Sequence, residues 1–206
     1  MAIIWPFVIP RATLGAATAS DHHIQSPLND PVEVTDYDPA WSDLFQLERR
    51  QICPVLGRMA VAIEHVGSTA VPGLAAKPVL DILVGARPFP LSDDTLAALG
   101  TLGYAYRGVR GAGGDQFFRT NPRTRHLHVV AYGGEEWHAC LLFREYLRSH
   151  PDVAAEYGAL KRMLATHYRF DRRRYSEGKA AFLRATLQQA ARELADRSVG
   201  SHEAIE

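Results

Sequence analysis

EHVGSTAVPGLAAKPVLDILV, residues 64–84, carries the strongest structural signal in this chain. An apolar run ends where this segment begins, the chain turns through Gly-Ser-Thr, and a second apolar run follows with Asp81 in its middle. We interpret the two runs as neighbouring strands, at about 60–66 and 78–84. A buried carboxylate without a partner costs roughly several kcal/mol. Asp81 is therefore expected to be paired, bound to a metal ion, or placed at the mouth of a cleft.

Outside this segment the pattern predicts alternating helices and strands. Asp38-Pro39 is typical of a helix start, as a cap followed by a first-turn proline, and Ser92 is typical of another. Three further strands are expected, at 103–109, 115–120 and 126–132. Three more helices are expected, beginning near residues 136, 153 and 176. Together these segments predict an α/β (α+β) fold: a mixed sheet of about five strands, helices packed on it, and a C-terminal helical block.

The length and composition suit one globular domain. The chain has 206 residues, of which 47% are hydrophobic and 22% charged, so a sizeable core can form. We place the domain at residues 32–196, with 1–31 as a flexible leader and 197–206 as a disordered tail. The apolar start at residues 2–9 is too short to cross a bilayer and contains a proline, so no membrane segment is predicted.

Charge and cysteine content argue against several functional classes. Lysine plus arginine and aspartate plus glutamate both total 23, which does not favour a nucleic-acid binder. One basic cluster stands late in the chain, at Arg169, Arg172, Arg173 and Arg174. We interpret it as a solvated helix end, with a phosphate-binding patch as the alternative. Cys53 and Cys140 lie far apart, so neither a disulfide framework nor a zinc knuckle is indicated, and a cytoplasmic location suits them.

The turn after the first strand is a candidate phosphate cradle. Backbone N–H groups and a hydroxyl at Gly67-Ser68 would face a turn at a strand end, where anions bind. Asp81 would lie in the adjacent strand, so a carboxylate and a cradle would share one edge of the sheet. Phosphoryl chemistry needs this arrangement, because a divalent cation bridges a carboxylate and phosphate oxygens.

This motif resembles that of the nucleotidyltransferase superfamily, and the chain is similar more closely to the GrpB family, which has that fold. The segments that carry the resemblance are 32–41 (VEVTDYDPAW), 64–84, 125–130 (RHLHVV), 141–165 and 175–183 (YSEGKAAFL). The resemblance implies a nucleotidyltransferase-like protein that transfers a nucleotidyl group to a small acceptor with the help of a metal ion. It also implies, by analogy with family members fused to the enzyme, a link to dephospho-coenzyme A kinase.

The resemblance and the residues together suggest three sets of site residues. Asp81 and Lys77 are the catalytic candidates. The nucleotide- and phosphate-binding candidates are Gly67, Ser68, Thr69, Lys77, Arg119 and Lys179. The metal-binding candidates are Asp81, His126 and His128, the last two on one face of a strand. The implied cation is Mg²⁺, Mn²⁺ or Zn²⁺, and imidazole ligands suit Zn²⁺ or Mn²⁺ better than Mg²⁺.

One departure from the superfamily leaves the activity open. The second carboxylate of the superfamily falls at Leu83, as it does in the GrpB family. The alternative function is therefore a non-catalytic nucleotide- or metabolite-binding accessory or regulatory domain. Three alternatives to a site role also stand: the histidines would act as hydrogen-bonding groups, Lys77 as the ion-pair partner of Asp81, and Arg119 and Lys179 in surface salt bridges.

Overall fold

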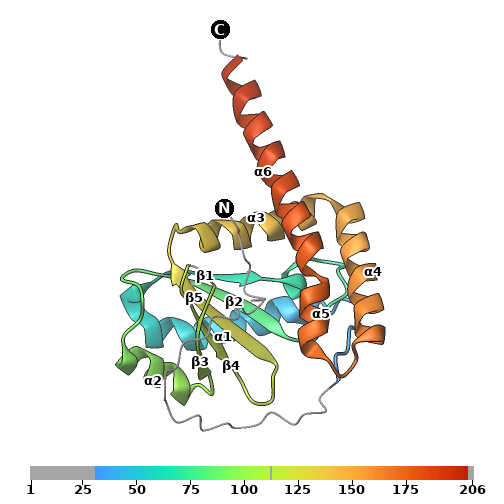
Figure 1. The fold of residues 1–206 in the computed structure, drawn as a ribbon. Helices are drawn as coiled ribbons and strands as arrows, with labels where there is room; N and C mark the ends of the chain where they lie inside the picture. Colours follow the sequence, from blue (N-terminus) through green and yellow to red (C-terminus); the bar gives the residue numbers. More distant parts are fainter. Residues whose placement is uncertain (1–30, 112, 204–206) are drawn as a thin grey trace, which may run out of the picture.

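The computed structural model describes residues 31–111 and 113–203, which form a five-stranded mixed sheet with helices packed against it (Figure 1). The elements are α1 (Ala40–Leu56), η1 (Gly57–Met59), β1 (Ala60–Val66), η2 (Ser68–Ala70), β2 (Leu80–Ala86), α2 (Asp93–Thr101), β3 (Ala105–Arg110), β4 (Asp115–Arg119), β5 (Arg125–Ala131), α3 (Glu135–Ser149), α4 (Pro151–His167), α5 (Arg172–Gly178) and α6 (Ala180–Glu203). The predicted fold class is confirmed, including the C-terminal helical block.

The strand order is β1-β2-β5-β4-β3, and the central pair β2–β5 is parallel while the other pairs are antiparallel. The register of the parallel pair places Asp81 opposite His126 and Leu83 opposite His128. The prediction that the strands at 60–66 and 78–84 are neighbours is therefore confirmed, and the strand expected at 126–132 lies on the other side of β2. Segments more than 40 residues apart in sequence meet at this point of the sheet because the crossover returns β5 to the side of β2.

One face of the sheet packs against α1 and α2 and holds the main hydrophobic core. The buried side chains from α1 are Trp41, Phe45, Ile52 and Leu56. Those from the strands are Ile63, Ile82, Val84, Phe118, Leu127 and Val129. Since side chains alternate along a strand, Asp81 and Leu83 lie on the other face of β2.

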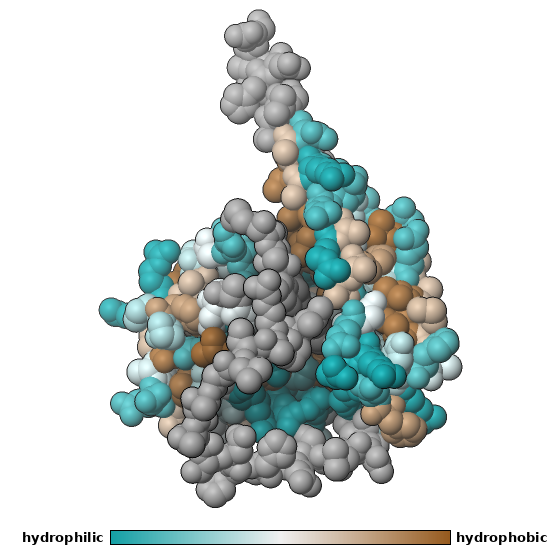
Figure 2. All heavy atoms as spheres, in the orientation of Figure 1, coloured by the Kyte–Doolittle hydropathy of each residue, from teal (hydrophilic) through white to brown (hydrophobic). Residues whose placement is uncertain are grey.

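The other face is covered by α3 to α6, and the far half of α6 projects away from the body (Figure 1). Val66, Leu83 and Val130 pack there against Trp137 and Cys140 of α3. In Figure 2 the coloured residues of α6 that project from the body are mostly hydrophilic on the visible side. Each helix within the described residues is either too short or too polar to span a bilayer.

A buried carboxylate joins α1 to the sheet. Glu48 accepts a hydrogen bond from the Tyr104 hydroxyl at 2.7 Å and pairs with Arg125 Nε at 3.1 Å. Glu48 is only 6% exposed, so both of its oxygens need partners inside the protein. This network anchors the start of β5, the strand that carries the two histidines of the candidate site.

The C-terminal helices differ from the prediction at one point. We expected a single helix from about Ser176, whereas α5 ends at Gly178 and α6 begins at Ala180. A Cβ at Gly178 would lie 2.5 Å from Leu164 Cδ2, so the close approach of α4 requires glycine there. Glycine is a poor helix former, and the helix breaks at this position.

The predicted domain ends are only partly visible. Residues 1–30, nearly all of the predicted leader, lie outside the described residues. At the other end, α6 continues to Glu203, so the helix extends into the segment 197–206 that we expected to be a disordered tail. Residues 204–206 are outside the described residues.

The Glu48 network generates a stability prediction. Tyr104→Phe removes one buried hydrogen bond to a carboxylate and should lower the free energy of unfolding by about 1–3 kcal/mol. Tyr106→Phe is the matched control, because Tyr106 is 39% exposed and its ring contact with Phe118 is kept. Urea denaturation monitored by tryptophan fluorescence measures both. Equal stability of the two variants would show that the Tyr104 bond contributes nothing net.

Candidate functional site

A pocket opens on the helical side of the sheet, between the start of β2 and the helices α4 to α6. It encloses a cavity of about 50 Å³. Its lining residues are Gly67, Ser68, Thr69, Lys77, Val79, Asp81, His126, Phe143, Tyr157, Lys161, Tyr175, Lys179 and Leu183. A water needs about 10–15 Å³ of such space, so the enclosed part has room for a few waters or one compact group such as a phosphoryl group.

Asp81 and His126 form the centre of the site. His126 Nδ1 lies 3.0 Å from Asp81 Oδ1, across the parallel pair β2–β5. Burial would raise the pKa of Asp81, but the hydrogen bond and charge of His126, with further help from His128 and Lys77, lower it to about 2. Burial lowers the pKa of His126 against the opposing effect of Asp81. At neutral pH the pocket therefore holds an ionised carboxylate beside a neutral imidazole.

Asp115 of β4 forms a hydrogen bond with His128 on the side of the ring away from Asp81. His128 Nδ1 lies 2.8 Å from Asp115 Oδ2, and its Nε2 lies 4.0 Å from Asp81 Oδ1. Burial opposes the charged imidazole, but the two carboxylates outweigh it and raise the pKa of His128. Asp115 is only 2% exposed, and its Oδ1 has no hydrogen-bond partner among the described residues. The contact fixes the ring so that Nε2 faces Asp81.

Asp81, His126 and His128 together offer a metal-ion ligand set. One ligand atom from each residue can be chosen so that all three lie within 4.8 Å of one another. Two imidazole nitrogens and a carboxylate oxygen are donors that Zn²⁺ and Mn²⁺ accept. The three predicted metal-binding residues are therefore close together, and their donor atoms are of a type that fits such an ion.

The turn after β1 lies directly against Asp81. Gly67 has φ +71°, and a Cβ built there would lie 2.4 Å from Asp81 Oδ2. Both the backbone conformation and the space therefore require glycine. Ser68 follows at the start of η2 and lines the pocket together with Tyr157. The two predicted cradle residues thus border the same pocket as the ligand set.

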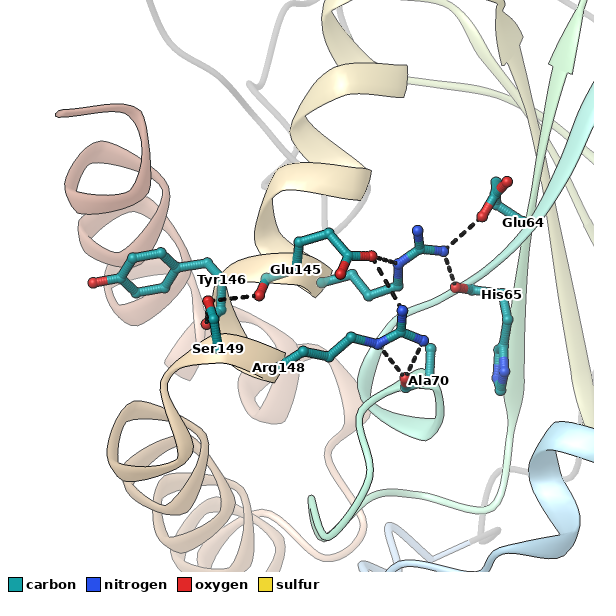
Figure 3. Close-up of polar contacts among 8 residues, drawn as sticks. Glu64, His65, Ala70, Glu145, Tyr146, Arg148 and Ser149 are labelled. Carbon is teal, nitrogen blue, oxygen red and sulfur yellow. Dashed lines mark hydrogen bonds and ion pairs between the residues drawn. The ribbon is translucent and has the colours of Figure 1, made fainter. Parts of the chain in front are cut away.

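Two arginines of α3 hold the turn in place. Figure 3 shows the Arg148 guanidinium at the Ala70 carbonyl, which accepts hydrogen bonds from Nε at 3.0 Å and from Nη2 at 2.8 Å. Arg144 Nη1 donates to the carbonyl of His65 and to the carboxylate of Glu64, both at 2.8 Å. The last residues of β1 and the η2 turn are thereby tied to α3 rather than to the sheet alone.

Lysines supply most of the charge of the pocket. Lys161 and Lys179 are 2% and 3% exposed. Burial lowers the pKa of Lys161 to about 7, with Arg162 and Lys77 acting in the same direction against Asp81. Burial also lowers the pKa of Lys179, and the neighbouring Lys77 and Lys161 add to that effect. Each lysine makes it less favourable for its neighbours to carry a positive charge. Such a grouping of lysines is typical of a site that binds an anion.

Two candidates identified from the sequence have other positions or contacts. Thr69 borders the pocket, but its hydroxyl lies 2.9 Å from His65 Nε2. That histidine is buried on the other face of the sheet and stacks on Phe45 with ring centroids 4.9 Å apart. Arg119 is not among the lining residues; it is paired with His126 in the sheet and lies near other arginines.

Sequence reasoning missed Lys161, Asp115 and the two tyrosines of the pocket. Tyr157 is 3% exposed and lines the pocket, although aromatic residues on helices usually indicate core packing. No sequence pattern indicated a role for Asp115, because its contact with His128 follows only from the pairing of β4 with β5. A signal for Lys161 was present: the chain has three lysines against twenty arginines. All three lysines line this one pocket.

The chain resembles known proteins over most of its length. A family model described as GrpB protein matches residues 31–189. UPF0157 protein YqkA of Bacillus subtilis is 34% identical over 163 residues, which are 78% of this chain and 48% of that protein. A UPF0157 protein of Streptomyces coelicolor is 39% identical over 159 residues, which are 77% of this chain and 84% of that protein. The crystal structure of the conserved protein GrpB from Enterococcus faecalis superimposes with a TM-score of 0.73 at 35% identity, covering 79% of this chain and 99% of that one.

Some relatives are longer than this chain. The chain spans about half the length of YqkA and 64% of a relative from Pseudomonas aeruginosa. A protein of Mycolicibacterium paratuberculosis named dephospho-CoA kinase is 27% identical over 162 residues, which are 39% of its length. The similarity in these cases covers one part of a larger protein.

The contact between Gly67 and Asp81 generates a second prediction. Gly67→Ala forces a side chain against the carboxylate in a backbone conformation that costs about 1–3 kcal/mol by itself. We expect a loss of about 3 kcal/mol or more in unfolding free energy, together with weaker Mn²⁺ binding. Gly73→Ala is the matched control: φ is +77° there, but a Cβ meets nothing within 4 Å. It should cost about 1 kcal/mol and leave Mn²⁺ affinity unchanged. Equal losses at both positions would show that only backbone strain matters.

Burial of His65 predicts a pH dependence of stability. Burial lowers the pKa of His65 from 6.5 to about 4, against the smaller opposing effect of Asp81. Between these pH values the unfolded state binds more protons, so stability falls as the pH drops from above 6.5 to about 4. The expected loss from this residue is about 3 kcal/mol. His65→Gln should flatten that part of the pH profile of unfolding free energy, whereas His138→Gln, at an exposed position, should not. Identical profiles for wild type and His65→Gln would contradict the assignment.

Proposed function

The chain belongs to the GrpB family, and we propose that it binds a divalent cation and a nucleotide or other phosphorylated small molecule, and transfers a nucleotidyl group to a small acceptor. The observation that supports this function is one pocket in which three features meet: the Gly67-Ser68 turn, the ligand set around Asp81, and the buried lysines. Each feature is suited to a part of a phosphorylated ligand or to the cation that accompanies it.

Asp81, His126 and His128 would hold the cation. A cation bound there would supply positive charge to polarise a phosphoryl group. The protein's own residues provide the remaining functions. Asp115 keeps His128 oriented, Gly67 lets the main chain approach Asp81, and Lys77 adds charge at the edge of the pocket. Their positions are held by the sheet and by α3, so the site is preorganised before a ligand enters.

The non-catalytic alternative has its own supporting observation. Leu83, at the place of the superfamily's second carboxylate, is fully buried and packs against Val66 and Trp137. Two-metal nucleotidyl transfer uses ions held about 3.5–4 Å apart by several carboxylates. The described pocket presents one carboxylate, Asp81, among its lining residues. A protein that binds the ligand and signals its presence would need no second acid.

The proposal for partners is limited to this pocket. A nucleotide or phosphorylated small molecule is the ligand class that the charges favour. By family analogy we also propose a link to dephospho-coenzyme A kinase, for which the segment similar to the Mycolicibacterium protein is the supporting observation. Such a segment, carried by a kinase, would suit an accessory role in nucleotide metabolism.

Asp81→Asn tests the metal-dependent function. The change removes the anionic ligand but keeps a similar shape, so Mn²⁺ and Zn²⁺ binding by calorimetry should fall at least tenfold. Stability in metal-free buffer at neutral pH should fall by about 2 kcal/mol, because, against the effect of burial, contacts with His126 and other cationic groups lower the pKa of Asp81 to about 2 and so stabilise its ionised form in the folded protein. Asp43→Asn, at an exposed position on α1, controls for the loss of one charge. Unchanged metal affinity in Asp81→Asn would overturn the proposed cation site.

A nucleotide panel separates catalysis from binding. Wild-type protein with Mn²⁺ is incubated with each nucleoside triphosphate and a mixture of small alcohols and amines, and pyrophosphate release is followed by ³¹P NMR. Pyrophosphate release that Asp81→Asn abolishes supports transfer. A ligand-induced rise in melting temperature without any turnover supports the binding function. Neither response with any nucleotide would contradict both.

A further inference from the structure

All of the lysines in this chain surround one pocket. The chain has twenty arginines and three lysines, Lys77, Lys161 and Lys179. The three come from separate segments: the loop before β2, the middle of α4, and the junction of α5 and α6. Each of them lines the pocket. Arginine thus provides nearly all of the basic side chains of this chain, and its few lysines all lie at one pocket.

The three ammonium groups are packed against aromatic rings. The Nζ atoms of Lys77 and Lys179 lie 5.2 Å and 4.7 Å from the centre of the Tyr175 ring. Lys161 Nζ lies 4.5 Å from the centre of the Tyr157 ring and donates a hydrogen bond to the carbonyl of Ala75. Each ammonium group therefore lies close to the face of an aromatic ring, where a cation is favourably placed.

Basic side chains outnumber carboxylates among the described lining residues of this pocket. Three lysines face one carboxylate, Asp81, which is itself hydrogen-bonded to His126. Burying ammonium groups costs free energy unless an anion compensates them. The lowered pKa of Lys161 and Lys179 reflects this cost. An anion with two or more negative charges would favour the protonated form of all three lysines.

The choice of lysine over arginine indicates the shape of that anion. An arginine fork suits flat, bidentate contacts, whereas an ammonium is a compact charge that can surround a tetrahedral group from several directions. The enclosed cavity of about 50 Å³ matches one phosphoryl group. A nucleoside or another bulky part of a ligand has to lie outside this enclosed space.

We propose that Lys77, Lys161 and Lys179 form an oxyanion subsite that holds a terminal phosphate or diphosphate without the help of a metal ion. The inference deepens the proposed function and rests on it only for the identity of the rest of the ligand. The ligand is then a compound that ends in a phosphate, with that end enclosed by the lysines and its remainder toward the pocket opening. Asp81 and the histidines flank this end from the sheet.

Pyrophosphate is the probe for the subsite. Calorimetric titration of the full chain with inorganic pyrophosphate, in excess EDTA, should show binding. Lys179→Met should weaken it at least tenfold. Arg162→Met, which removes an exposed cation next to Lys161 on α4, should change it less than twofold. Asp81→Asn should keep or strengthen pyrophosphate binding. Citrate, a trianion without a phosphoryl group, should bind at least tenfold more weakly; equal affinity for both anions would overturn the phosphate assignment.

The same titrations separate this inference from the proposed function. Pyrophosphate binding that needs Mn²⁺ would overturn the lysine subsite and leave the metal proposal standing. Binding in EDTA by a protein that responds to neither metals nor nucleotides would support the subsite and overturn the proposed function. Lys161→Met is a second variant, although it also removes a hydrogen bond to Ala75, so Lys179→Met is the main one.

Chemical labelling of the wild-type chain avoids any dependence on how the variants fold. The aldehyde of pyridoxal 5′-phosphate condenses with a lysine amine, water leaves, and borohydride reduces the imine to a stable secondary amine. Because the three lysines are the only side-chain amines of the chain, peptide mass spectrometry reports on this pocket alone. Labelling should be suppressed at least fivefold by pyrophosphate, while the α-amino group serves as an unprotected reference. Lysine labelling that pyrophosphate leaves unchanged would overturn the proposal.

Discussion

The parallel pairing of β2 with β5 is the constraint on which the candidate site depends. It places Asp81 opposite His126, and the same register positions His128 two residue pairs further along, opposite Leu83. Their side chains share a face because alternation along both strands is in step. A register shift of one residue would turn these polar groups into the hydrophobic core beneath α1. The main core, with Ile82 and Leu127 at its centre, therefore also fixes the site geometry.

Helices added on the other face convert this polar edge into an enclosed pocket. α3 ties down the turn after β1 through Arg144 and Arg148, and α4 brings Lys161 to the loop before β2. The junction at Gly178 allows α5 to approach α4 closely. The pocket is thus lined by groups from the sheet, two loops and several helices, and its charges are held apart from water by their packing.

The buried polar groups of the site lower the stability of the folded protein relative to an apolar core. Two buried lysines and a buried histidine–carboxylate pair each replace what could have been hydrophobic contacts. Such groups are retained where a ligand offsets their cost. Next to these groups on the same face, Leu83 packs with Val66 and Val130 in an apolar cluster against α3.

The sequence by itself determined the elements and part of the site. Alternating apolar runs, the turn at Gly67 and a lone Asp81 in a strand are local signals, so the sheet and its carboxylate followed from them. The grouping of Lys161 with Lys77 and Lys179, and the support of His128 by Asp115, depended on the tertiary structure. Lys161 lies 80 residues from Asp81, and the pairing of β4 with β5 brings Asp115 to His128. Contacts between distant segments are set by how helices pack and strands pair, and no local pattern encodes them.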